Sequence, residues 1–158
     1  MAKLYLSLGS NEGDREILLR AAIDAIDLLV GQVDGISPFI ETEPWGFESK
    51  HPFLNAALSV ETSLPTMDIL DRTQEIERQL GRQRKSVAGQ YQDRPIDIDL
   101  LFYDDLVLST ERLSLPHPLI QERLFVLDPL AEIAPQFLHP TLGKTIQTLR
   151  DELRLRLD

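Results

Sequence analysis

The sequence contains no cysteine, which excludes disulfide bridges and metal sites built from thiolates. It also lacks a long apolar run. The N-terminal segment MAKLYLSLGS has one lysine and a hydrophobic stretch that is too short for a signal peptide or a membrane span. We therefore expect a cytoplasmic protein that has no membrane partner.

Positively charged residues are in the minority, with 16 Lys and Arg against 26 Asp and Glu and a net charge of −10. Nonspecific binding to nucleic acid requires many phosphates to be neutralised, so this balance argues against such a partner. The basic residues are nevertheless clustered, and the stretch 72–94 contains Arg72, Arg78, Arg82, Arg84, Lys85 and Arg94. A local patch of this kind suits a small anionic ligand, although a solvated charged surface is the plainer interpretation.

The chain has 158 residues and a mass of 18.0 kDa, and it is 42% hydrophobic and 27% charged. This is the composition of a soluble globular protein. Its length fits a single domain, 1–158, with a continuous core. No repeat, linker or low-complexity segment interrupts it.

The first part of the chain alternates between strand and helix patterns. Strands are expected at 4–8, 36–42 and 53–64, and the glycines of GSNEG are interpreted as a plain turn after the first of them. The stretch 14–30 has apolar residues at helical spacing, with Asp14 as the expected N-cap and a stripe made of Leu18, Ala22, Ala25 and Leu29.

The second part continues the alternation. A helix is expected over 65–80 and a strand over 95–102, followed by a hairpin within 103–118 and helices within 119–135 and 143–155. The order is roughly β-α-β-β-α-β with additions. We therefore expect an α+β fold of the ferredoxin-like type, with helices packed on an antiparallel sheet.

Two aspartates stand one residue apart in the segment DRPIDIDLLFYDD. Alternation along the strand puts Ile96, Ile98, Leu100 and Phe102 on one face and places Asp97 and Asp99 on the other, with their Cβ atoms roughly 7 Å apart. Carboxylates this close raise each other's pKa unless a cation lies beside them. Mg²⁺ takes one or two carboxylates and completes its shell with water and phosphate oxygens, so the pair fits a metal–phosphate site. An exposed pair that is simply solvated is the alternative.

Five segments in order carry a family resemblance: YLSLGSN, TEPWGFESKHPFLNAA, RPIDIDLLFYDD, ERLSLPHP and ERLFVLDPLAEIAP. From the first of them to about Pro140 the chain resembles 6-hydroxymethyl-7,8-dihydropterin pyrophosphokinase, an enzyme family of folate biosynthesis. The resemblance implies that the pyrophosphoryl group of ATP is transferred to the hydroxymethyl group of the pterin, which leaves AMP. It also implies Mg²⁺, as two ions bound with ATP, and a ferredoxin-like fold.

The same resemblance implies roles for individual residues. Asp97 and Asp99 match the magnesium ligands, and Arg82 and Arg94 match arginines that contact phosphates and support the transition state. Further positions match nucleotide-binding residues: Gln74, Glu77, Arg84, Tyr91, Arg94, Ile98, Arg112, Ser114, His117 and Arg123. Gln92 and Asp93 stand where many family members have Gly-Pro, and Tyr91 stands where some have tryptophan.

The pterin is flat and has donors and acceptors along one edge, so aromatic side chains should sandwich it while an amide reads that edge. The matching positions are Thr42, Pro44, Trp45, Phe53, Asn55, Asp97 and Phe125. Asparagine is depleted in strands, so Asn55 favours a functional role. The two phenylalanines could equally be ordinary core residues.

Two other functions remain open at the level of sequence. One is a metal-dependent phosphoesterase that uses the aspartates to activate water. The other is a noncatalytic regulator that binds a nucleotide or a pterin. AMP released only when the pterin is present would distinguish transfer from both. Asp97 is the best candidate for a general base, and a monomer is expected.

Overall fold

The computed structural model describes residues 1–42, 52–81 and 95–157. Its main sheet is antiparallel throughout and runs in the order β2-β4-β1-β5, with β3 also paired to β4. The strands are β1 (Ala2–Ser10), β2 (Gln32–Ile36), β3 (Ile40–Thr42), β4 (Phe53–Thr62) and β5 (Asp97–Tyr103). The two long central strands, β1 and β4, are therefore the frame on which the rest is built.

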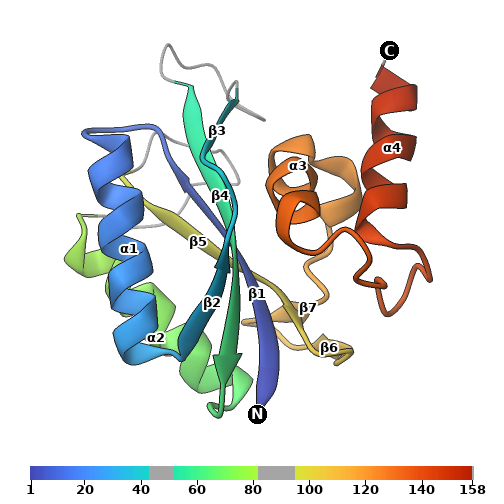
Figure 1. Cartoon of the computed structure of the whole chain (residues 1–158). Coiled ribbons are helices and arrows are strands. Elements are labelled where there is room, and N and C mark those ends of the chain that lie inside the picture. Colours follow the sequence, from blue (N-terminus) through green and yellow to red (C-terminus); the bar gives the residue numbers. More distant parts are fainter. Residues whose placement is uncertain (43–51, 82–94, 158) are drawn as a thin grey trace.

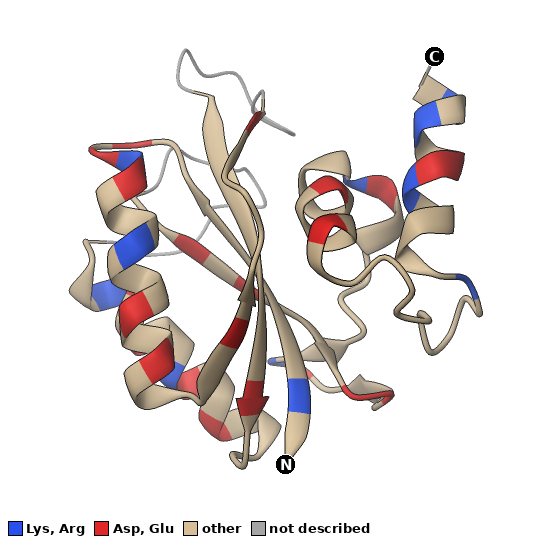
Figure 2. Ribbon diagram, viewed as in Figure 1, with Lys and Arg blue, Asp and Glu red and all other residues tan. Residues whose placement is uncertain are grey.

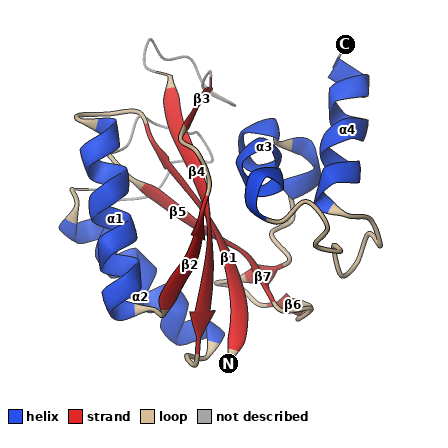
Figure 3. Cartoon of the chain, in the orientation of Figure 1, coloured by secondary structure: helices blue, strands red, loops and turns tan. Residues whose placement is uncertain are grey.

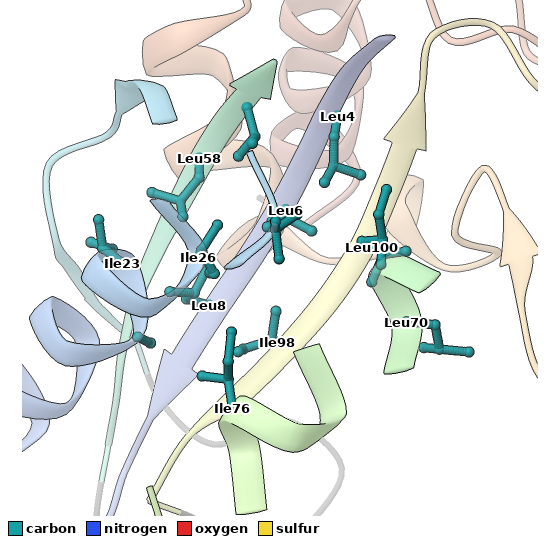
Figure 4. Close-up of a cluster of buried hydrophobic side chains, with 14 of the residues drawn as sticks. Leu4, Leu6, Leu8, Ile23, Ile26, Leu58, Leu70, Ile76, Ile98 and Leu100 are labelled. Carbon is teal, nitrogen blue, oxygen red and sulfur yellow. The ribbon is translucent and has the colours of Figure 1, made fainter. Parts of the chain in front are cut away.

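Two helices, α1 (Arg15–Leu29) and α2 (Thr66–Gln79), lie side by side on one face of the sheet (Figure 1). The Asp14 side chain accepts a hydrogen bond from the backbone N–H of Ile17 at 3.2 Å, which confirms the expected cap of α1. The core between these layers contains alternate residues of β1 and β5 together with one stripe of each helix (Figure 4): Leu4, Leu6, Leu8, Ile98 and Leu100 meet Ile23, Ile26, Leu70 and Ile76.

The opposite face is covered by α3 (Leu124–Ile133) and α4 (Ile146–Leu157), so the molecule has helix layers on both sides of the sheet (Figure 3). A single turn of 3-10 helix, η1 (Ile120–Glu122), precedes α3. The expected hairpin is present as β6 (Leu108–Ser109) and β7 (Ser114–Leu115). None of the described helices has the length and hydropathy that crossing a bilayer requires.

The prediction of a ferredoxin-like α+β fold is confirmed, because β1-α1-β2 and β4-α2-β5 put both helices on one face of an antiparallel sheet. Three local expectations were wrong. The stretch 36–42 is not one strand, since β2 begins earlier, at Gln32, and β3 is separate. Of the stripe expected for α1, Ala22 is buried and Ala25 and Leu29 only pack against the core. The other buried residues of the helix are Leu19, Ile23 and Ile26.

The third correction concerns Phe102, which does not share a face with Ile98 and Leu100. Tyr5 pairs with Phe102 while Leu6 pairs with Leu100, so Leu101 is an extra residue in β5. This bulge reverses the alternation. Phe102 consequently joins the second core, beneath α3 and α4.

Candidate active site

Asp97 and Asp99 open β5, and both are half-buried. Ile98 between them belongs to the core under α1 and α2, so alternation turns the two carboxylates toward the opposite face. Acidic residues on β5 appear in red in Figure 2. Across the ladder the two aspartates pair with Gly9 and Ser7 of β1. Pairing with β1 therefore fixes the backbone from which the two carboxylates project.

A row of residues crosses the sheet at the level of the first aspartate. Gly9 of β1 pairs with Asp97 on one side and with Asn55 of β4 on the other, so the three residues share a face. A Cβ atom at Gly9 would lie 3.0 Å from Asn55 Oδ1 and 3.4 Å from Phe53 Cδ1. The glycine thus leaves space between the amide and the carboxylate.

The Asn55 amide has a fixed orientation. The residue is 2% exposed, and its Nδ2 donates to Thr42 Oγ1 at 2.5 Å and to the carbonyl oxygen of Ile40 at 3.4 Å. Both partners lie on β3, which pairs with β4 at this point. Since the donors of the amide are used on β3, its carbonyl oxygen Oδ1 is the atom that faces Gly9.

The two aromatic residues implied for the pterin lie on neighbouring elements. Phe53 is the first residue of β4, and Phe125 is in the first turn of α3, which packs against β4. Both side chains are half-buried, and Phe125 also packs against the second core. The guanidinium carbon of Arg123 lies 5.6 Å from the centre of the Phe125 ring, a cation–π distance.

His117 is placed near the aspartates by the bulge of β5, because its backbone N–H donates to the carbonyl oxygen of Leu101 at 3.0 Å. Burial, and then the positive charge of Arg123, lower the pKa of His117 from 6.5 to about 4, while Asp97 acts in the opposite direction. The ring is therefore neutral at pH 7. Its Nδ1 accepts the backbone N–H of Leu119 at 3.3 Å, so the proton is on Nε2.

The implied nucleotide residues on the other side of β5 also come together. Arg112, between β6 and β7, donates to Gln74 Oε1 at 3.2 Å and to Asp71 Oδ1 at 2.7 Å, and both acceptors are on α2. Its ion-pair partner is thus Asp71 rather than the adjacent Glu111. Ser114 begins β7, which contacts β5.

Three of the implied nucleotide residues are buried: Glu77, Ile98 and Arg123. The side chain of Ile98 is in the first core, and its backbone N–H donates to Glu77 Oε2 at 2.8 Å. Six further candidates lie outside the described residues: Pro44, Trp45, Arg82, Arg84, Tyr91 and Arg94.

The metal ligands available in the described ranges are few. No group of three or more His, Cys, Asp or Glu side chains gathers there in a way that could hold an ion. The oxygen donors of Asp97 and Asp99 alone fit a magnesium ion that takes its remaining ligands from water and phosphate. They do not fit a site in which protein side chains supply all the ligands of the metal ion.

Sequence reasoning missed Gly9 and Asp71. Gly9 was interpreted as part of a turn, whereas it lies within β1. A glycine inside a strand often marks the close approach of a ligand, and that signal was available. Nothing in the sequence pairs Asp71 with Arg112, since the contact joins two elements that are distant along the chain.

A family model described as 7,8-dihydro-6-hydroxymethylpterin-pyrophosphokinase (HPPK) matches residues 5–135. The chain belongs to this family. Among HPPK relatives, the 2-amino-4-hydroxy-6-hydroxymethyldihydropteridine pyrophosphokinase of Porphyromonas gingivalis is 52% identical over 141 residues, which cover 89% of this chain and 95% of that protein. The protein of the same name from Aquifex aeolicus is 37% identical over 156 residues, covering 99% and 95%.

Solved structures agree with this fold. The crystal structure of wild-type Plasmodium falciparum HPPK-DHPS superposes with a TM-score of 0.78 at 17% identity, covering 99% of this chain and 45% of that chain. A second structure of that protein, with pteroate, gives a TM-score of 0.80 at 15% identity. This HPPK chain thus spans less than half of the Plasmodium protein, and the likeness concerns the fold.

Proposed function

We propose that this HPPK-family enzyme transfers the pyrophosphoryl group of ATP to the hydroxymethyl oxygen of 6-hydroxymethyl-7,8-dihydropterin, which yields AMP and serves folate biosynthesis. Family membership supports the reaction class. The observation that carries the proposal is the position of Asp97 and Asp99. They share one face of β5, between the Asn55 side of the sheet and the elements that hold His117 and Arg112.

Asp97 and Asp99 would hold two magnesium ions together with ATP. When bound, such ions would neutralise the negative charge of the phosphates. The two half-buried carboxylates on one stiff strand supply the hard oxygen donors that this cation prefers.

The pterin would lie over Gly9, with Asn55 at one end and Asp97 at the other. The Asn55 carbonyl oxygen is free to accept from the donor edge of the ring because the NH₂ group is bonded to β3. Phe53 and Phe125 would stack on the two faces of the ring. Thr42 fixes the amide, and Pro44 and Trp45 complete the proposed lining.

ATP would occupy the region between β5, β7 and the start of α3. Neutral His117 would donate from Nε2 to a phosphate oxygen, and the buried Arg123 would add a positive charge beside it. Arg112 and Gln74 would act as a bonded pair, next to Ser114. Glu77, Arg84, Tyr91, Arg94 and Ile98 complete the proposed nucleotide set.

In the proposed reaction the hydroxymethyl oxygen attacks the β-phosphorus of ATP. The new O–P bond forms while the bond from the β-phosphorus to the α,β-bridging oxygen breaks, and AMP leaves with that oxygen. Asp97 is the best candidate to take the hydroxyl proton. Arg82 and Arg94 would balance the charge that grows on the leaving oxygen. Catalysis is then mainly positioning and charge compensation.

The test is AMP formation by Asp97→Asn and Asp99→Asn. Each variant keeps the size of the side chain but loses a charged metal ligand, so we expect turnover to fall by roughly 10²–10³-fold or more, the usual effect of removing one group that stabilises charge. The matched control is Asp105→Asn, which neutralises an exposed aspartate just beyond β5 and should leave turnover unchanged. Full activity in either site variant contradicts the mechanism.

We also propose that the chain forms one domain and acts as a monomer in the cytoplasm. The two cores share a single sheet, which supports one domain. The net charge of −10 supports a small-molecule enzyme without a nucleic-acid partner.

A further inference from the structure

Glu77 is a carboxylate in a position where carboxylates are costly. It is 3% exposed and lies on the buried stripe of α2, together with Ile69, Thr73 and Ile76. Burying such a group costs free energy unless hydrogen bonds compensate it. Its Oε2 accepts the backbone N–H of Ile98 at 2.8 Å, a contact that links α2 to β5 across 21 positions of the sequence.

The donor of this hydrogen bond is the residue between the two proposed metal ligands. In an antiparallel pair, successive residues direct their N–H groups alternately toward the partner strand and away from it. The Ile98 N–H meets Glu77, so it is directed away from β1. Among the described strands β5 pairs only with β1. The Glu77 carboxylate therefore takes the place of a neighbouring strand on the outer side of β5.

The hydrogen bond between Glu77 and Ile98 lies at the beginning of β5, beside both aspartates. β5 begins at Asp97, so the aspartates occupy the end of the strand, where the bond to Glu77 adds a contact on the side that does not pair with β1. Ile76 and Ile98 lie in the same core cluster, so α2 packs against β5 directly beside the bond (Figure 4). An ionised carboxylate forms a stronger hydrogen bond to an N–H group than a neutral acceptor does.

We propose that Glu77 is a positioning residue for the metal site: its carboxylate holds the Ile98 peptide and thereby sets the backbone from which Asp97 and Asp99 project. It acts on the metal site through these two residues. This inference rests on the proposed function, because it assigns Glu77 to the magnesium site of the same reaction. Partners that orient metal ligands typically change metal affinity or activity by 10- to 100-fold when they are lost.

The test compares Glu77→Leu, which removes the acceptor, with Glu77→Gln, which keeps an acceptor oxygen but removes the charge. For each we would measure the Mg²⁺ concentration that gives half-maximal AMP formation, and the KM for ATP at saturating Mg²⁺. Glu77→Leu should raise the Mg²⁺ requirement at least tenfold, and Glu77→Gln should restore most of the loss. The control is Glu75→Gln, which removes an exposed charge on the same helix and should leave both quantities unchanged.

A second readout does not depend on turnover. Amide hydrogen exchange at Ile98 should be faster in Glu77→Leu than in the wild type, and Mn²⁺ binding in the presence of an α,β-methylene ATP analogue should weaken in parallel. If Glu77→Leu does not fold, Glu77→Asp provides the test, because it keeps the charge but withdraws the acceptor by one methylene group.

The measurements distinguish a failure of the proposed function from a failure of the positioning role of Glu77. If the wild type forms no AMP with pterin and MgATP, the proposed function fails, while exchange and Mn²⁺ binding still decide the role of Glu77. The positioning role is overturned if the acceptor-free variant keeps wild-type exchange at Ile98 and wild-type affinity for the metal. It is also overturned if only the KM for ATP rises, since that result would indicate a direct nucleotide contact.

Discussion

At the scale of single residues, the site depends on a side chain that is missing. Gly9 lies in the middle strand of the row that joins Asn55 to Asp97, and any larger residue would project into the space between them. The Asn55 amide has little freedom to move aside because both of its N–H donors are bonded to β3. The backbone does not require glycine here, since the φ of Gly9 is not among the positive values of the described residues. In the proposed site the missing side chain leaves room for the pterin.

We predict that Gly9→Ala raises the KM for the pterin and leaves the KM for ATP nearly unchanged. The new Cβ atom, 3.0 Å from Asn55 Oδ1, would push this acceptor away from the ring. Weakening one hydrogen bond by about 1 kcal/mol corresponds to a roughly fivefold rise in KM. Steady-state kinetics with each substrate varied in turn would measure it.

The control for this prediction is Gly143→Ala. Gly143 has a φ of +67° and no atom near its would-be Cβ, so the substitution strains the backbone far from the site. It should lower stability by about 1 kcal/mol without changing either KM. Equal rises in both KM values for Gly9→Ala would contradict the assignment of Gly9 to the pterin side.

At the scale of secondary-structure elements, the bulge in β5 connects the core with the site. The extra residue, Leu101, turns Phe102 into the second core, where its ring lies 6.3 Å from Tyr5 and 4.6 Å from Phe137. The carbonyl oxygen of Leu101 accepts the backbone N–H of His117. The extra residue thus brings Phe102 into the core beneath α3 and α4, and it also places His117 near Asp97.

We predict that deletion of Leu101 destabilises the protein by about 4 kcal/mol or more, because it removes a side chain buried in the second core and the carbonyl oxygen that accepts the backbone N–H of His117. Urea unfolding followed by circular dichroism would measure the loss. Leu101→Met keeps the bulge and the approximate volume, so it should cost less than about 1.5 kcal/mol. A deletion that costs no more than this replacement would show that the bulge is dispensable.

Patterns in the sequence predicted the elements well because most elements bury one regular face. The alternation of Ile96, Ile98 and Leu100 placed both aspartates on the correct side of β5. It failed at Phe102 because alternation assumes one residue per partner, and a bulge leaves no mark in the composition. Only the three-dimensional pairing with Tyr5 reveals it.

The helix stripes show a similar limit. The first helix has apolar residues around most of its circumference, and Ile17 and Leu28 are exposed, so spacing alone could not select the buried face. Glu77 carried a signal that was not used, since it lies at helical spacing from buried Thr73 and Leu70. A carboxylate on an apolar stripe indicates a specific partner. The identity of that partner, a backbone N–H of β5, required the structure.

At the scale of the whole molecule, net charge bears on whether the proposed site would bind ATP alone or ATP together with a metal ion. The protein carries a net charge of −10, and two of its acidic residues stand within the proposed site. Uncomplexed ATP, itself an anion, would be repelled by this field. A metal ion alone would find only two carboxylates among the described residues. If the proposed function holds, we therefore expect each ligand to need the other.

We predict that Mg²⁺ and an α,β-methylene ATP analogue stabilise the protein only together. By mass action, a ligand at 100 times its Kd adds about 2.7 kcal/mol of stability, which corresponds to a rise in Tm of about 5–10 °C for a chain of this size. Either component alone should shift the Tm by less than about 1 °C. Differential scanning calorimetry would measure all three conditions.

The matched variant for this measurement is Asp99→Asn. It should abolish the joint shift while leaving the Tm of the unliganded protein within a few degrees of the wild type, because the side chain is half-buried and outside both cores. The methylene bridge replaces the oxygen at which the proposed reaction breaks the chain of phosphates, so the complex cannot turn over during the scan. A large shift with the analogue alone would mean that nucleotide binding does not depend on the aspartates. The electrostatic basis of the site would then lie elsewhere in the chain.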